Sequence, residues 1–194
     1  MDAKQLFFER YQGFRDYPEH LVKDLTEEQL RHTPHASLNP ISWTLWHIAR
    51  CEDVGVNRLL ADRAEVFAEG GWQSRLGVRR RDVGTGMSKA EVKQLCEAVN
   101  LDELDAYRAA VTERTIAAVD ALPLAELTQE LTRQQLRRVL VDEGAGGAVA
   151  EDIVRAYDGH TKGWLLGHLA LTHSFYHIGQ AFGVRALLGA PNPW

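Results

Sequence analysis

Cysteine is scarce in this sequence, and so are long apolar runs and positive charge. The only cysteines are Cys51 and Cys96, so disulfide bonds are not the basis of the fold. No stretch approaches the roughly 18 apolar residues of a membrane span, and Met1 is followed by Asp2 and Lys4 instead of an apolar signal segment. Lysine and arginine number 22 against 27 aspartates and glutamates, a net charge of -5 that disfavours a dedicated nucleic-acid binder. We therefore expect a cytoplasmic protein with no nucleic-acid partner and no membrane partner.

The composition is that of a folded globular domain. Of the 194 residues, 45% are hydrophobic and 25% are charged, which excludes a disordered or collagen-like chain. A chain of this length buries a core without metal or disulfide cross-links. About fifty residues follow the glycine-rich segment 144–147, too few for a second core. We predict a single domain spanning residues 1–194.

Helical periodicity dominates the pattern of apolar residues. Asn39 and Pro40 are expected to be the cap and the first residue of the second helix. Residues 69–86 are rich in glycine and arginine and predict a loop. Four long helices joined by loops favour an all-α four-helix bundle, with this Gly/Arg-rich loop and a short extra helix or two. The predicted helices span residues 6–25 (kinked at Pro18), 40–60, 88–99, 100–122, 124–141 and 162–188.

Three of the eight histidines are candidates for one metal site. His173 and His177 are four residues apart on the last predicted helix, hence neighbours on one face. His47 lies among apolar residues of the second helix and is also expected to face inward. His168 would be rotated by about 140° from His173 on an α-helix and is not expected to join them. Three imidazoles from two helices match a catalytic metal site that keeps a fourth position open.

The same residues allow a metal-free interpretation. A single histidine on an apolar face is more often a hydrogen-bonded core residue than a ligand, and three imidazoles can also satisfy one another with buried water. Imidazole ligation does not choose among zinc, nickel, iron and manganese. Cys51 lies one turn after His47 and is either a fourth ligand or a small buried hydrophobe.

Two segments carry a family resemblance. The sequences SWTLWHI (residues 42–48) and HSFYHIGQ (residues 173–180), and the separation of 126 positions (173 − 47) between His47 and His173, resemble the DinB-like (YfiT-like) superfamily. The resemblance covers nearly the whole chain. It implies a four-helix bundle in which His47, His173 and His177 bind one divalent metal ion per chain. Ile178 stands where many relatives carry an arginine after the last ligand, so a substrate-binding role of that arginine does not transfer.

The resemblance implies an activity in broader terms. The best understood relatives are transferases and isomerases that use a low-molecular-weight thiol, such as mycothiol or bacillithiol. It therefore implies a metal-dependent thiol S-transferase with a small-molecule substrate, a homodimeric state, and zinc or nickel ahead of iron or manganese. The alternatives are a metal-dependent hydrolase with an activated water, and a non-catalytic metal-binding protein connected with stress.

Several polar residues near these motifs are weaker candidates. The proposed catalytic or positioning groups are Glu52, Asp53, Tyr176 and Gln180, of which Tyr176 and Gln180 are expected on the inward row of the last helix. Arg79, Arg80 and Arg81, together with Arg75, are candidates for binding the carboxylates or hydroxyls of a thiol cofactor. The alternative for each is an ordinary solvated side chain or a packing residue.

Overall fold

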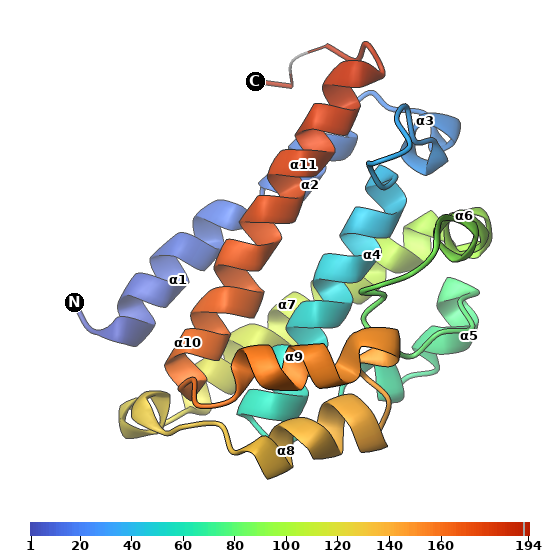
Figure 1. The fold of residues 1–194 in the computed structure, drawn as a ribbon. Helices are drawn as coiled ribbons and strands as arrows, with labels where there is room; N and C mark the ends of the chain where they lie inside the picture. Colours follow the sequence, from blue (N-terminus) through green and yellow to red (C-terminus); the bar gives the residue numbers. More distant parts are fainter. Residues whose placement is uncertain (192) are drawn as a thin grey trace.

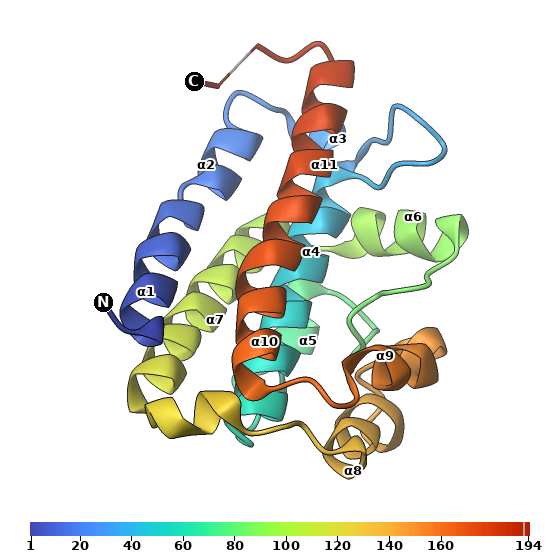
Figure 2. The same ribbon diagram turned by 60° about the vertical axis from the view of Figure 1, so that its left-hand side comes forward.

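The protein is a helical bundle with a smaller layer of helices across one end. The computed structural model describes residues 1–191 and 193–194, and no strand occurs in that part. Figures 1 and 2 show the long helices side by side and α8 and α9 crossing one end of the bundle. The predicted all-α bundle is confirmed. The bundle helices are α1 (Ala3–Phe14), α2 (Tyr17–Val22), α4 (Ile41–Glu52), α7 (Leu101–Ala121), α10 (Lys162–Gly167) and α11 (His173–Leu187), and the shorter ones are α3 (Glu27–Arg31), α5 (Trp72–Leu76), α6 (Lys89–Ala98), α8 (Arg133–Arg137) and α9 (Ala150–Tyr157).

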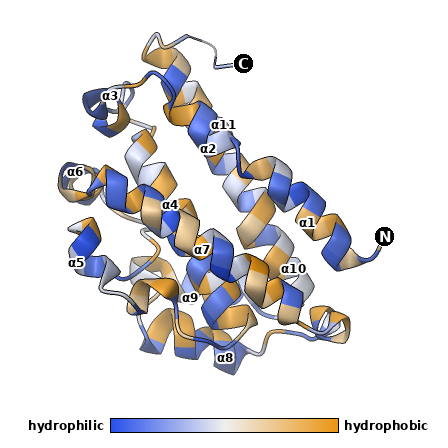
Figure 3. Cartoon of the chain, turned by 180° about the vertical axis from the view of Figure 1, so that it is seen from behind, coloured by the Kyte–Doolittle hydropathy of each residue, from blue (hydrophilic) through white to orange (hydrophobic). Residues whose placement is uncertain are grey.

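Helix α4 is the centre of the bundle. All twelve of its residues are buried, and it packs against α7 on one side and α11 on the other. Figure 3 shows the outer helices with both hydrophilic and hydrophobic faces, as expected for helices that line a core. Because α4 has no solvent-facing side, its polar residues His47, Arg50 and Glu52 must find partners inside the protein. Among the described helices, none has the length and apolar character needed to cross a bilayer.

Two predicted helix starts need correction. The segment predicted as one helix kinked at Pro18 is two helices, and Pro18 lies in the first turn of α2. Proline is favoured there because the first turn requires no backbone N–H donor. The second helix begins one residue later than predicted, since Pro40 itself is the cap. The predicted caps Ser88 and Asn100 are confirmed: each side chain accepts a hydrogen bond from a backbone N–H of the first turn.

Three regions differ from the prediction, because they contain additional short helices or a break in a predicted helix: residues 25–31, 69–86 and 124–157. α3 and α9 were not predicted, and α5 lies inside the segment predicted as a loop. The single helix predicted for 124–141 is a 3₁₀ turn (Leu124–Thr128), then α8, then a π-helical turn (Arg138–Asp142). It breaks because the backbone N–H of Leu131 donates to the carbonyl of His160, and Thr132 caps a new helix.

Two other π-helical segments shape the bundle beside α4 and α11. Asp53–Leu60 continues α4, and His168–Thr172 joins α10 to α11. A π turn holds one residue more than an α turn, so side chains beyond it are rotated relative to an uninterrupted α-helix. The two segments cross at Gly55, where an added Cβ would collide with the side chain of Leu169. Glycine therefore permits the close approach that brings α4 and α11 together.

Candidate metal centre

The three candidate histidines converge between α4 and α11. His47 comes from the middle of α4, His173 is the first residue of α11, and His177 follows one turn later. Their ring centroids are 5.1 Å apart for His47 and His173, 4.8 Å for His47 and His177, and 4.5 Å for His173 and His177. One nitrogen from each ring lies within 4.8 Å of the others. His47 is buried, whereas His173 and His177 are partly exposed, so the cluster is open on one side.

A backbone carbonyl sets the orientation of His47. Its Nδ1 lies 2.5 Å from the carbonyl oxygen of Val83, which only accepts hydrogen bonds. Nδ1 therefore carries the proton, and the lone pair of Nε2 is free to bind a ligand. The loop holds Val83 in place through Gly84, whose φ is +78° and where a Cβ would collide with the indole of Trp46. The sequence contains no local signal for this contact, because it joins residues 36 positions apart.

His173 contains a buried nitrogen without a partner. Its Nδ1 has no hydrogen-bond partner among the described residues. A buried polar atom left unsatisfied costs free energy, and a divalent ion shared with His47 and His177 would remove that cost. The donor set of three neutral imidazoles with an open side matches the ligand requirement of zinc and related divalent metals. The residues present fit a metal ion.

Burial keeps the three imidazoles uncharged. It lowers the pKa of His47 to about 4, and it lowers the pKa of His173 to about 2 with a smaller contribution from the neighbouring imidazoles. Burial also lowers the pKa of His177. A histidine must be neutral to bind a metal, so all three rings are in the ligand form at neutral pH.

His168 lies beside the cluster without belonging to it. It is outside the group of three found among the described residues, as predicted. The predicted separation of about 140° from His173 is wrong, however, because the intervening turn is π-helical and the two rings are 5.7 Å apart. His168 stacks on Trp164, which in turn stacks on His160. These aromatic rings form one edge of the site.

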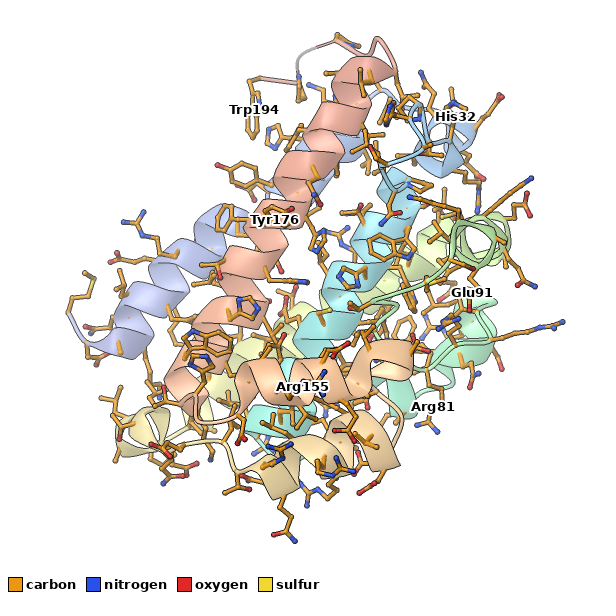
Figure 4. All side chains as sticks on the ribbon, viewed as in Figure 1. His32, Arg81, Glu91, Arg155, Tyr176 and Trp194 are labelled. Carbon is orange, nitrogen blue, oxygen red and sulfur yellow. The ribbon has the colours of Figure 1, made fainter. Side chains whose placement is uncertain are left out.

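Tyr176 and Gln180 do not lie on the inward face of α11. Both are exposed, Tyr176 at 63%, and Gln180 donates a hydrogen bond to the Tyr176 hydroxyl. The π turn shifts the buried row by one residue, to Ser174 and Ile178. Figure 4 shows Tyr176 on α11. The prediction of an inward position is therefore wrong.

Glu52 and Asp53 have partners away from the three imidazoles. Glu52 accepts hydrogen bonds from the hydroxyls of Tyr11 and Thr115. Asp53 accepts hydrogen bonds from Tyr107 and from the backbone N–H groups that follow Glu65, and it pairs with Arg50. Neither carboxylate belongs to the cluster found among the described residues.

The arginines of the loop differ from one another. Arg75 pairs with Glu103, and Arg80 pairs with Asp82 and Glu91. Arg79 and Arg81 are exposed, and Figure 4 shows Arg81 on the outside of the loop. The ion pairs of Arg75 and Arg80 link the loop to α7 and α6. A role of Arg79, Arg80 or Arg81 in cofactor binding stays a prediction.

Cys51 packs against the site as a neutral thiol. Its Sγ lies 3.7 Å from both ring nitrogens of His47. Burial raises the pKa of the Cys51 thiol to about 12, so it stays protonated at neutral pH. Metal ligation requires a thiolate, and Cys51 is absent from the cluster found among the described residues. Its environment is that of a small buried hydrophobe.

Comparison with known proteins identifies the family. The model of the DinB superfamily matches residues 10–181, and the chain belongs to that superfamily. A crystal structure of a conserved protein from Enterococcus faecalis has the same fold, with a TM-score of 0.72 and 18% sequence identity over 97% of this chain and 99% of that one. A search of the curated proteins gives no match.

Proposed function

We propose that this protein binds one divalent metal ion through His47, His173 and His177. The observation that carries the proposal is the meeting of three neutral imidazoles, one with an unpartnered buried nitrogen. Val83 fixes the His47 ring, so the site is preorganised and does not form only on binding. Membership of the DinB superfamily supports the same assignment.

We further propose that the protein is an enzyme that transfers groups to or from a low-molecular-weight thiol. A divalent ion at this site would supply Lewis acidity, lowering the pKa of a bound thiol or water. His173 and His177 are partly exposed, so a small molecule can approach the open side of the cluster. The cluster found among the described residues contains no carboxylate to act as a base. This favours a reagent that brings its own readily ionised nucleophile, as a thiol does.

Thiol binding can be tested on the cobalt-substituted protein. Addition of cysteine, glutathione, mycothiol or bacillithiol is expected to produce a sulfur-to-cobalt charge-transfer absorption with at least one of them. The same titration of the His173→Ala protein gives the background from free cobalt. Absence of the band with every thiol, together with thiol-independent hydrolysis of a simple ester by the metal-loaded protein, would favour an activated water and contradict the transferase proposal.

Metal binding is expected to resist acid more than an ordinary histidine site does. Free imidazoles gain protons near pH 6.5 and then stop binding metal. The lowered pKa values of His47 and His173 delay that protonation to more acid pH. The zinc affinity, measured by competition with a chromophoric chelator, is therefore expected to change little between about pH 8 and pH 6.5 and to fall only well below the ordinary imidazole pKa. A steep loss of affinity beginning at the ordinary value would show that the rings are not protected.

A further inference from the structure

A cavity lies on another side of α4 from the three imidazoles. Its volume is about 430 Å³, and it is lined by residues of α1, α2, α4 and α7. Glu52 at its inner end follows His47 by five residues on α4, which rotates it by about 140° around the helix axis. The volume is in the range of pockets that hold small molecules. The cavity is therefore a candidate site separate from the metal centre.

Glu52 lines this cavity and has one carboxyl oxygen without a hydrogen bond from the described residues. The residue is only 7% exposed. Its Oε1 accepts hydrogen bonds from the Tyr11 hydroxyl and, at 2.7 Å, from the Thr115 hydroxyl. Its Oε2 has no hydrogen-bond partner within the described part of the chain, and Glu52 lines the cavity. Because Oε2 is not fully enclosed by protein atoms, a donor that enters the cavity can reach it.

The charge of the lining favours a cation. Five carboxyl groups line the cavity against two guanidinium groups, an excess of three negative charges when Glu52 is ionised. Arg108 forms its ion pair, at 2.9 Å, with Asp105, and its charge also lowers the pKa of Glu52 against the larger, opposite effect of burial. The remaining acidic residues of the lining are exposed and lie toward solvent: Asp16, Glu19, Asp105 and Glu113.

The cavity also has apolar walls. Phe14, Ile48 and Val111 line it together with Ala49. These side chains exclude water around the carboxylate, and burial raises the pKa of Glu52 to about 7. An inorganic cation would gain little from such walls, whereas an alkyl chain would bury apolar surface against them.

We propose that this cavity binds an aliphatic primary amine, whose ammonium group donates to Oε2 of Glu52 while its alkyl chain packs against Phe14, Ile48 and Val111. The exposed carboxylates around the cavity suit a second ammonium group, so a linear polyamine matches the whole site better than a monoamine. Nothing in this assignment depends on the metal centre.

The test is calorimetric titration of the full chain with spermidine at about pH 8, above the raised pKa of Glu52, and at about 0.15 M salt, which screens diffuse attraction between exposed charges. Glu52→Gln keeps an oxygen for Tyr11 and Thr115 but removes the negative charge from the cavity. We expect it to weaken spermidine binding by roughly tenfold or more. Glu28→Gln changes the net charge equally at an exposed position outside the cavity and is expected to bind like the wild type.

Two further variants test where the amine binds. Ala109→Phe fills the cavity from an exposed position and is expected to abolish binding without lowering the melting temperature. His173→Ala is expected to bind spermidine normally, so failure of the metal proposal would leave this result intact. Equal affinity of the wild type and Glu52→Gln would overturn the proposal. The absence of spermidine binding would also overturn it, and this is the result expected if Arg108 turns from Asp105 to Glu52. Binding of inorganic phosphate in preference to spermidine would overturn it as well.

Discussion

Replacing His173 with alanine is expected to leave the protein folded but without its divalent ion. The wild type should contain about one ion per chain after reconstitution with zinc, as the three-imidazole site requires. Loss of a residue that merely orients a ligand already costs roughly 10- to 100-fold in metal affinity, and His173 is proposed as a ligand itself. The measurement is elemental analysis of tag-free protein, supported by circular dichroism to establish folding. Saturating zinc should also raise the melting temperature of the wild type alone.

His168→Ala is the matched control for this experiment. His168 lies in the same continuous run of helix, and its ring is 5.7 Å from that of His173, but it is outside the cluster of three. It should therefore keep its zinc, whereas His47→Ala and His177→Ala should lose it. Stoichiometric zinc in all three ligand variants would contradict the proposed metal site. Loss of zinc in His168→Ala to the same degree would show that the ligand set has been assigned incorrectly.

The features predicted well from the sequence are those determined by nearby residues. Ser88 and Asn100 cap helices because their side chains reach backbone donors three positions away. The spacing of His173 and His177 places them on one face because no irregular turn separates them. The apolar neighbours of His47 predicted that it faces inward as well, and the family resemblance supported its grouping with that pair, since no local rule links residues 126 positions (173 − 47) apart.

The features predicted poorly depend on π-helical turns and on distant contacts. The turn at His168–Thr172 adds a residue, and this alone moves Tyr176 and Gln180 out of the inward row and brings His168 toward His173. No residue type at these positions indicates a π turn, because it is stabilised by packing such as that of Leu169 on Gly55. The hydrogen bond from His47 to the carbonyl of Val83 could not be predicted from the sequence either, since any residue type offers the same backbone acceptor.

Replacing Asp53 with alanine is expected to destabilise the protein by about 3–5 kcal/mol, the cost of breaking a buried ion pair from one side. Asp53 is fully buried, and it accepts hydrogen bonds from the backbone N–H groups of Val66 and Phe67 and from the Tyr107 hydroxyl. Its removal leaves those donors unsatisfied and deprives the buried Arg50 guanidinium of one counter-charge. Urea unfolding of both metal-free proteins measures the difference in free energy.

Asp152→Ala provides a comparison with the same sequence spacing. Asp152 and Arg155 are also three residues apart on a helix, but their ion pair is exposed to solvent. Its removal should cost less than about 1 kcal/mol, because water solvates the arginine that is left behind. A cost for Asp53→Ala as small as that for Asp152→Ala would contradict the role of the buried network. Removal of Asp53 should also affect the metal centre through Arg50. The Arg50 guanidinium donates to the carbonyl of Arg81, two residues before the Val83 carbonyl that orients His47. Weaker zinc binding by Asp53→Ala is therefore expected even where the variant remains folded.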